Sequence, residues 1–394
     1  MRVVFVAKST YNFSYISSIV ESLKMSGCEL ELLFDMDWSD KKLGDSLIQF
    51  VLSSKLVNSN WLLRRSDRWR KLIFPIRELR TYLNYKKRGD QPYYEHRWAG
   101  YVPKWHRVPL PDKAFTLIEK CIPPDNKIVK DLQRRKPDVV VATPTNHRFS
   151  EEVEYIKAAR FLGIPTAIIV LSWDNLTTKG LFHVIPDKVL VWNEAHKKEA
   201  INIHSVPKDR ICITGAPFFD KWFEEHGIFK PLVDKPYILY LGSSRNIIKD
   251  ETDLIIKTQK KYGMPLVVRA HPANTRNIKK IKGDTIFVMP TRLPESKKEQ
   301  AELYSAIHHC EFAVGVNTSA MIDAIIQDKP CIAVGRNQGQ TTHFNHMLPA
   351  LGVDGDRKKF VRDFIRPYGK HVHAGWVASE RIRELGTKII YRSV

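Results

Sequence analysis

The chain has 394 residues, of which 43% are hydrophobic and 10% aromatic, so it favours two folded domains and excludes a disordered protein. Its formal net charge of +20 predicts an anionic partner, such as a lipid surface, a nucleic acid or an acidic substrate. No apolar run approaches the roughly 18–20 residues that span a bilayer, and Val3–Val6 is too short for a signal sequence. We therefore expect a cytoplasmic protein.

Cysteine usage points to the same compartment. The five cysteines are widely spaced and include no Cys-x-x-Cys pair. This spacing favours buried thiols in a reducing environment over disulfides or a structural zinc site.

Strand-like and helix-like patterns alternate from the start of the chain. A strand over residues 2–7, a helix over 14–25 and a strand over 29–34 form an opening βαβ unit. This unit lacks Gly-x-Gly-x-x-Gly, so no dinucleotide cofactor is expected. Further apolar runs predict later strands over residues 139–142, 166–171, 189–192 and 211–214.

Residues from about 41 to 110 interrupt this alternation and predict an inserted subdomain. Between Trp61 and Arg107 there are 13 Lys and Arg residues against four Asp and Glu residues, interleaved with Trp and Tyr. Three interpretations remain open. The segment 61–107 binds an anionic membrane surface, or it binds an anionic acceptor, or it is a helical subdomain with a solvated basic face.

Polar residues follow several of the predicted strands in the first half. Thr143–His147 follow the strand over 139–142, and Ser172–Gly180 follow the strand over 166–171. The carboxyl ends of parallel strands form the ligand crevice of an open α/β sheet. We expect Asp174 to be the catalytic base, with His147 as second choice and Asp35 as third. The alternative for Asp174 is that it only caps the turn in which it lies.

Loop composition around Pro231 and Pro236 predicts a domain boundary. We expect an N-terminal domain over 1–230, a C-terminal domain over 231–375, and a last helix within 376–394 that crosses back to the first domain. The second domain shows apolar runs over residues 237–241, 266–268, 285–289, 313–316 and 332–334.

Three of these runs end in polar, donor-rich residues. Free N–H groups at a helix start, hydroxyls and cationic side chains bind phosphate well. We therefore expect a nucleotide phosphate site, with His271 also counted as catalytic because it stabilises the leaving group. The alternatives are plain helix capping and strand-ending turns. The predicted phosphate-binding residues are Arg269, His271, Asn317, Thr318, Ser319, Ser243, Ser244 and Arg245.

Two Rossmann-like halves joined near residue 230 resemble the GT-B glycosyltransferases. His271-Pro272, the pair Thr318-Ser319 and Asp328-Lys329-Pro330 resemble motifs of bacterial surface and capsular polysaccharide transferases. Those include CDP-glycerol glycerophosphotransferases, capsule Kdo transferases and bacterial sialyltransferases. The resemblance covers roughly residues 237–336, while the first half matches only in its alternation of elements.

The resemblance implies a GT-B-like α/β fold, with two Rossmann-like domains whose parallel sheets face a cleft. It implies a glycosyltransferase that moves a sugar from a nucleotide-sugar donor of CMP, CDP or UDP type to a glycan or lipid-linked acceptor. The reaction would be inverting and would need no metal or other cofactor. The protein would act as a peripheral protein at the inner face of the cell membrane.

Two other functions remain open. Non-hydrolysing UDP-N-acetylglucosamine 2-epimerases share the fold and the His-Pro segment, but usually carry Ser-Gly-Gly where this chain has Asn317-Thr318-Ser319. They also place an acidic ribose contact where this chain has Gln338–Thr341. A nucleic-acid- or polyanion-binding protein would fit the charge, but no nucleic-acid-binding module is recognisable, so no nucleic-acid partner is expected.

Overall fold

A computed structural model describes residues 1–36, 58–107, 110–224, 230–244, 248–271, 274–275, 278, 281, 285–289, 297–335 and 344–390. The chain divides into two compact units. Unit 1 comprises Met1–Asp220 and Arg366–Val394, and unit 2 comprises Lys221–Ile365.

The expected domain limits at residues 230 and 375 lie a little beyond those of the two units. Side-chain packing explains the difference. The indole of Trp222 stacks on Tyr304 of unit 2, with 6.5 Å between ring centroids, whereas Arg366 pairs with Asp220 of unit 1 at 2.9 Å. The prolines at 231 and 236 therefore lie inside unit 2.

Unit 1 contains a parallel seven-stranded sheet in the order β3-β2-β1-β4-β5-β6-β7. The strand β3 was not predicted, because its polar sequence Asn-Ser-Asn-Trp lacks an apolar run; it pairs with β2 at the edge of the sheet. The strands are β1 (Arg2–Ser9), β2 (Glu29–Met36), β3 (Asn58–Trp61), β4 (Val139–Ala142), β5 (Thr166–Ile169), β6 (Lys188–Val191) and β7 (Ile211–Ile213).

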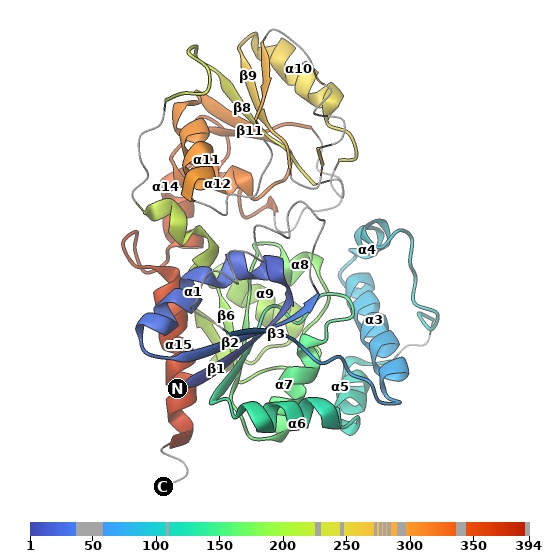
Figure 1. The fold of residues 1–394 in the computed structure, drawn as a ribbon. Coiled ribbons are helices and arrows are strands. Elements are labelled where there is room, and N and C mark those ends of the chain that lie inside the picture. Colours follow the sequence, from blue (N-terminus) through green and yellow to red (C-terminus); the bar gives the residue numbers. More distant parts are fainter. Residues whose placement is uncertain are drawn as a thin grey trace. The chain divides into compact units, whose positions relative to one another are not determined.

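Helices cover both faces of this sheet because its central strands are apolar on both sides. Val3 and Phe5 of β1 pack toward α1 (Phe13–Met25) and α15 (Ala374–Ile390), whereas Val4 and Val6 pack toward α6 (Asn126–Arg135) and α7 (Glu152–Phe161). Figure 1 shows α15 running along the sheet beside α1. The helix α9 (Glu194–His204) adds Ala200 to the core around β5 and β6.

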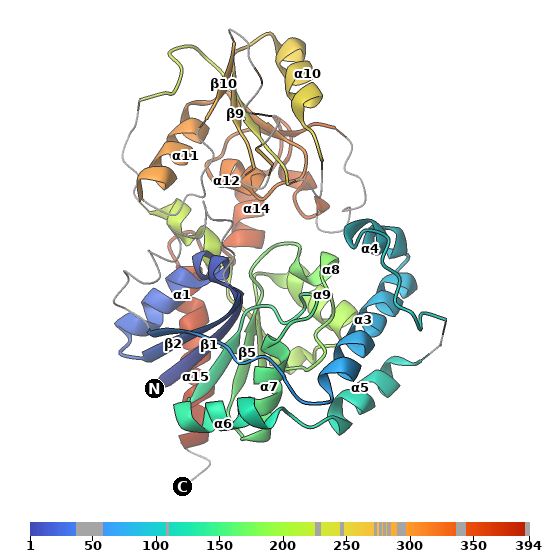
Figure 2. The same cartoon turned by 45° about the vertical axis from the view of Figure 1, so that its right-hand side comes forward.

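The predicted insertion forms the helices α3 (Arg70–Lys87) and α4 (Gln91–Arg97), and α5 (Asp112–Cys121) follows it; residues 41–57 lie outside the described part. Figures 1 and 2 show these helices beside the sheet, next to α7. The helices α3 and α4 enclose a core of four buried tyrosines. These are Tyr82, Tyr85, Tyr93 and Tyr94.

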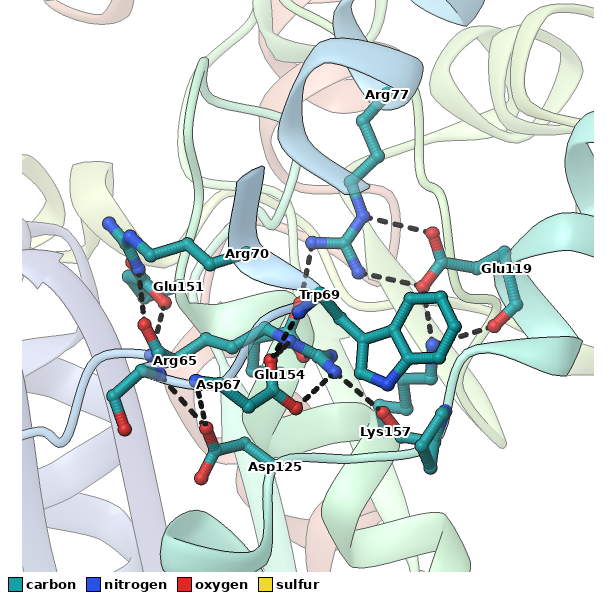
Figure 3. Close-up of polar contacts among 12 residues, drawn as sticks. Arg65, Asp67, Trp69, Arg70, Arg77, Glu119, Asp125, Glu151, Glu154 and Lys157 are labelled. Atoms are coloured by element: carbon teal, nitrogen blue, oxygen red, sulfur yellow. Dashed lines mark hydrogen bonds and ion pairs between the residues drawn. The ribbon is translucent and has the colours of Figure 1, made fainter. Parts of the chain in front are cut away.

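A buried ionic network joins the insertion to α7 (Figure 3). Arg65 and Arg77 each pair with Glu154 at 2.7 Å, and Arg77 also pairs with Glu119 at 2.7 Å. Lys157 reaches Glu119 at 2.9 Å. Arg65, Arg77 and Arg80 are all buried, so the segment 61–107 is not a uniformly basic surface.

Unit 2 contains a parallel five-stranded sheet in the order β10-β9-β8-β11-β12. Its strands are β8 (Ile238–Leu241), β9 (Leu266–Arg269), β10 (Ile286–Val288), β11 (Phe312–Gly315) and β12 (Cys331–Ala333). Its helices are α10 (Thr252–Tyr262), α11 (Lys297–His309), α12 (Ala320–Ile326) and α14 (Arg357–Phe360). Both sheets therefore place the first strand of their unit inside the sheet, with later strands on either side, as Rossmann-like sheets do.

Short helical segments complete the description: η1 (Thr10–Asn12), α8 (Asn175–Thr178), η2 (Lys208–Arg210), η3 (Pro217–Phe223), η5 (Leu348–Ala350) and η6 (Val361–Ile365). Within the described ranges, no helix combines the length and apolar character needed to cross a bilayer.

Candidate functional site

The phosphate-binding residues predicted for unit 2 follow three neighbouring strands. Ser243 and Ser244 follow β8, His271 follows β9, and Thr318 follows β11. Because β9, β8 and β11 are adjacent and parallel, their carboxyl ends lie at one edge of the sheet. The chain after β8 continues to β9 on one side of the sheet, whereas the chain after β11 continues to β12 on the other side. Ligands of α/β sheets bind between two such strands, at the point where the strand order reverses.

The loops after β8 and β9 are in close contact. The Gly242 N–H donates to the Arg269 carbonyl at 2.8 Å, and a Cβ atom on residue 242 would lie 2.8 Å from the backbone nitrogen of His271. Real Cβ atoms do not approach a backbone atom so closely. Glycine at 242 therefore allows His271 to lie beside the phosphate loop predicted after β8.

Ser243 organises this edge from inside. It is completely buried, and its N–H donates to the carboxylate of Glu251, at 2.9 Å to Oε1. Its carbonyl accepts from Asn274 at 3.1 Å, and its hydroxyl accepts from the Asn317 N–H at 3.5 Å. Since these groups are engaged within the protein, Ser243 links the loops, and Ser244 is left as the more accessible hydroxyl.

Glu251 is an unpredicted acidic group at this edge. It is buried, and its Oε1 accepts a hydrogen bond from the Tyr240 hydroxyl at 3.1 Å. Burial raises the pKa of Glu251 to about 7. A carboxyl that is readily neutralised repels a bound phosphate less than a fully ionised one would.

The pair Thr318-Ser319 begins α12, as expected, but the two hydroxyls differ. Thr318 is buried and its hydroxyl accepts from the Ala320 N–H at 3.4 Å, whereas Ser319 is exposed and makes no capping bond. Asn317 is buried beside Ser243. Asp323 of α12 was not predicted; burial raises its pKa to about 6, while the charges of Lys221 and Arg269 lower it.

His271 is held in its neutral form at physiological pH. Burial, with a smaller contribution from the charge of Arg269, lowers its pKa to about 4. A neutral imidazole donates one hydrogen bond and carries no charge of its own; of the predicted phosphate-binding residues that the structure describes, Arg269 is the charged one. Arg245, the remaining predicted residue, lies outside the described ranges.

Asp174, the predicted base, lies in unit 1 between β5 and α8. Its Oδ1 accepts from the Ser172 hydroxyl at 2.6 Å and its Oδ2 from the Thr178 hydroxyl at 2.8 Å. Lys179 approaches Oδ2 to 3.5 Å. The Asp174 side chain makes no capping bond to a backbone N–H of α8; the Asn175 side chain instead accepts from the N–H groups of Leu171 and Ser172. The Asp174 carboxylate is therefore held by two hydroxyls and the Lys179 ion pair.

His147, the second choice for the base, lies near Asp174 and Lys179. Burial and the charges of Lys179, Arg97 and Lys8 lower its pKa to about 3, while Asp174 acts in the opposite direction. His147 is therefore neutral, and it lies within electrostatic reach of three cations and of the Asp174 carboxylate. Such a weakly basic imidazole is better suited to hydrogen bonding than to proton abstraction.

The insertion contributes directly to this edge. Arg97 of α4 donates to the Tyr93 hydroxyl at 2.8 Å, and Asp174 is among the charges that raise its pKa. Tyr85 of α3 donates to the Lys179 carbonyl at 2.8 Å. The helical insertion therefore positions the residues around Asp174.

The loops after β4 and β5 are joined by Asn146. Its side-chain amide donates to the Asn175 carbonyl at 2.7 Å, and its own carbonyl accepts from the Gly180 N–H at 2.6 Å. A Cβ on residue 180 would lie 2.9 Å from that carbonyl oxygen, so the contact requires glycine. These bonds fix His147 and Asp174 on neighbouring loops.

Asp35, the third choice for the base, is already paired. Its carboxylate binds Lys8 at 2.6 Å and Arg64 at 2.7 Å. Nearby Glu152 is fully buried, its Oε2 accepts from the Ser150 hydroxyl at 2.6 Å, and burial raises its pKa to about 7. Ser150 thus bonds the Glu152 side chain, and α7 begins at Glu152 with Glu151 before it.

In the part of the chain that the structure describes, no group of three or more His, Cys, Asp and Glu side chains is arranged to hold a metal ion. The candidate groups are instead cations, hydroxyls and single carboxylates at the two sheet edges.

Comparisons with known proteins identify the fold. No protein-family model matches the chain, and no curated protein matches it either. Among solved structures, the UDP-GlcNAc 2-epimerase from Methanocaldococcus jannaschii aligns with a TM-score of 0.53 at 13% identity, over 98% of this chain and 100% of its own.

Two further structures give the same result. The UDP-GlcNAc 2-epimerase from Neisseria meningitidis bound to UDP-GlcNAc aligns with a TM-score of 0.55 at 12% identity, over 98% of this chain and 100% of its own. The S. aureus MnaA structure with UDP aligns with a TM-score of 0.55 at 13% identity, over 100% of this chain and 97% of its own. These likenesses, together with the two parallel sheets, confirm the predicted GT-B-like α/β fold.

Proposed function

We propose that the chain is an enzyme that uses a nucleotide-activated sugar, and that it transfers the sugar to a hydroxyl of a glycan or lipid-linked acceptor. The observation that carries this proposal is the edge of unit 2, where three adjacent strands present Arg269, His271 and the pair Thr318-Ser319. Cations, neutral donors and hydroxyls at a switch point suit a nucleotide phosphate.

In this proposal the leaving nucleotide is stabilised without a metal ion. Arg269 supplies the positive charge, the imidazole of His271 donates a hydrogen bond, and Ser244 and Ser319 offer accessible hydroxyls. The UDP and UDP-GlcNAc in the aligned structures support a nucleotide-sugar donor, for which CMP, CDP and UDP remain candidates. Acceptor activation is assigned to Asp174 of unit 1, with His147 as a hydrogen-bonding neighbour.

A second candidate is a UDP-sugar 2-epimerase of the same fold, which the solved epimerase structures favour. Asn317-Thr318-Ser319, where Ser-Gly-Gly is usual in those enzymes, favours the transferase. The two reactions differ in their products. A transferase releases free nucleotide and forms a glycosidic bond, whereas a 2-epimerase inverts the configuration at C2 and leaves the nucleotide attached.

Product analysis by NMR tests this choice. The protein is incubated with CMP-, CDP- and UDP-activated sugars, with and without a glycan acceptor extract. The proposal predicts acceptor-dependent release of one nucleotide. C2 inversion without nucleotide release would instead establish the epimerase. Retention on heparin at about 0.3 M salt, with no nucleotide-sugar turnover, would favour a polyanion-binding protein.

We further propose peripheral contact with the inner face of the membrane through the exposed part of the insertion. Trp105 is 54% exposed, and Lys86, Lys87 and Lys104 are exposed in the same segment. Trp and Lys side chains suit the interface of an anionic bilayer. Flotation with vesicles that contain phosphatidylserine measures this contact, and a failure of the protein to float would remove it from the proposal.

A further inference from the structure

Several cations lie near His147 at the carboxyl edge of the unit 1 sheet, among the residues that the structure describes. Lys8 lies near the carboxyl end of β1, Lys179 follows α8, and Arg97 ends α4. All three lower the pKa of the His147 imidazole, so they converge on one half-buried ring. Cations from three separate parts of the chain therefore gather at one place.

The acidic groups at this edge do not balance these cations. Lys8 shares the carboxylate of Asp35 with Arg64, at 2.6 and 2.7 Å. The Asp174 carboxylate forms an ion pair with Lys179 and interacts electrostatically with Arg97. Its oxygens also accept hydrogen bonds from the Ser172 and Thr178 hydroxyls. Among the described residues named here, four cations (Lys8, Arg64, Lys179 and Arg97) therefore share three carboxylates, even with Glu152 ionised.

Arg97 and Lys179 retain capacity for a ligand. The Nε of Arg97 is buried and has no hydrogen-bond partner among the described residues, and its Nη1 donates only to the neutral Tyr93 hydroxyl. Lys179 lies 3.5 Å from Asp174, which is longer than a direct hydrogen bond. Burial lowers the pKa of Lys179 to about 8; the Asp174 carboxylate acts against this shift, and the charge of Arg97 adds to it.

We propose that Arg97 and Lys179 bind an oxyanion on the acceptor, a phosphate or a carboxylate, beside the Asp174 carboxylate. This inference rests on the proposed function, which assigns the nucleotide phosphates to unit 2 and leaves the acceptor to unit 1. The guanidinium fork matches the two oxygens of a carboxylate or phosphate, and the ammonium group adds a point charge. The acceptor is thus an anionic one, such as a phosphorylated or acidic glycan.

The test measures binding of small probes to the full-length protein by titration calorimetry. The probes are glycerol 1-phosphate, glucuronate and neutral glucose, each added in the presence and absence of the nucleotide that binds best. The variants are Arg97→Gln, Lys179→Gln and Arg97→Lys. The matched control is Lys130→Gln, because Lys130 is an exposed cation of α6 in the same unit, outside the insertion.

One of the two anionic probes is expected to bind with nucleotide present, and glucose is not. Arg97→Gln and Lys179→Gln should each weaken that binding about tenfold or more, while Lys130→Gln leaves it unchanged. Arg97→Lys should bind more weakly than the wild type and more tightly than Arg97→Gln. Tighter glycerol 1-phosphate binding indicates a phosphorylated acceptor, and tighter glucuronate binding an acidic sugar.

The inference is overturned if neither anion binds the wild type, or if the anions bind the wild type and the Arg97→Gln and Lys179→Gln variants equally. Circular dichroism of each variant separates lost binding from lost folding, and Lys179→Gln decides the test if Arg97→Gln does not fold. Nucleotide binding by the wild type and by His271→Ala is measured in the same titrations, and this binding tests the proposed function separately from the anion site. If no nucleotide binds but probe binding still depends on Arg97 and Lys179, the proposed function fails and the anion site stands.

Discussion

Glu154 provides a quantitative test of how the insertion is held on unit 1 (Figure 3). Its two carboxylate oxygens pair with Arg65 and Arg77 at 2.7 Å, and its side chain is fully buried. The substitution Glu154→Gln keeps the shape of the side chain and removes its charge. Both guanidinium groups then keep one other carboxylate, that of Asp67 or Glu119.

Removing one partner of a buried ion pair costs about 3–5 kcal/mol, because the remaining charge stays out of water. Since each arginine retains a second carboxylate, we expect the lower end, about 3 kcal/mol. The matched control is Glu384→Gln, which breaks an exposed pair with Arg381 at 2.8 Å and should cost less than about 1 kcal/mol.

Urea unfolding followed by tryptophan fluorescence gives the loss of unfolding free energy, and hydrogen exchange shows where protection is lost. Protection should fall first in α3 and α4, and Arg97 is carried by α4. Equal losses in Glu154→Gln and Glu384→Gln would refute the conclusion that the buried network holds the insertion.

Three further predictions concern the two sheet edges. Gly242→Ala places a Cβ 2.8 Å from the backbone nitrogen of His271, so the two loops must separate. We expect the free energy of unfolding, measured in urea, to fall by about 1–3 kcal/mol. Nucleotide binding, measured by calorimetry, should become weaker. Asp174→Asn should retain nucleotide binding and lower acceptor-dependent nucleotide release by about 100-fold or more, and unchanged release would exclude Asp174 as the base. Because the pKa of Lys179 is lowered to about 8, chiefly by burial, anionic probes should bind more weakly as the pH rises from 7 to 9. Calorimetry at three pH values measures this loss, which Lys179→Arg should abolish because arginine stays charged.

The regular elements of the fold could be predicted because buried parallel strands consist of short apolar runs. Val139–Ala142 and Leu266–Arg269 are examples in which hydrophobicity alone identifies the strand. The edge strand β3 escaped prediction because its sequence is polar and its pairing with β2 is a long-range contact. A strand of this kind is specified by its partner and leaves no local pattern.

The insertion shows why composition alone misjudges a charged segment. The sequence left open membrane binding, acceptor binding or a helical subdomain with a solvated basic face, and it did not indicate that Tyr85 and Arg77 are buried. Arg77 is neutralised by Glu119 and Glu154, which lie far from it in the sequence. Net charge can be counted from a sequence, but ion pairing depends on tertiary contacts.

The candidate sites were predicted in part for a similar reason. Polar residues after strands, such as Asp174 and His271, could be identified because the carboxyl ends of strands carry the ligand crevice. Arg97 and Glu251 gave no comparable signal, since one lies on a helix of the insertion and the other at the start of α10. Lys179 lay within the polar stretch after β5. That Lys179, Arg97 and Lys8 all act on His147 became visible only in three dimensions.

The central claim is that the edge of unit 2 binds the nucleotide of an activated sugar. Titration calorimetry of the wild type and of His271→Ala with CMP, CDP, UDP and GDP tests it directly. We predict that one nucleotide binds the wild type with one-to-one stoichiometry, and that His271→Ala, while folded, binds it about tenfold more weakly. Failure of all four nucleotides to bind, or equal binding by the folded variant, would contradict the claim.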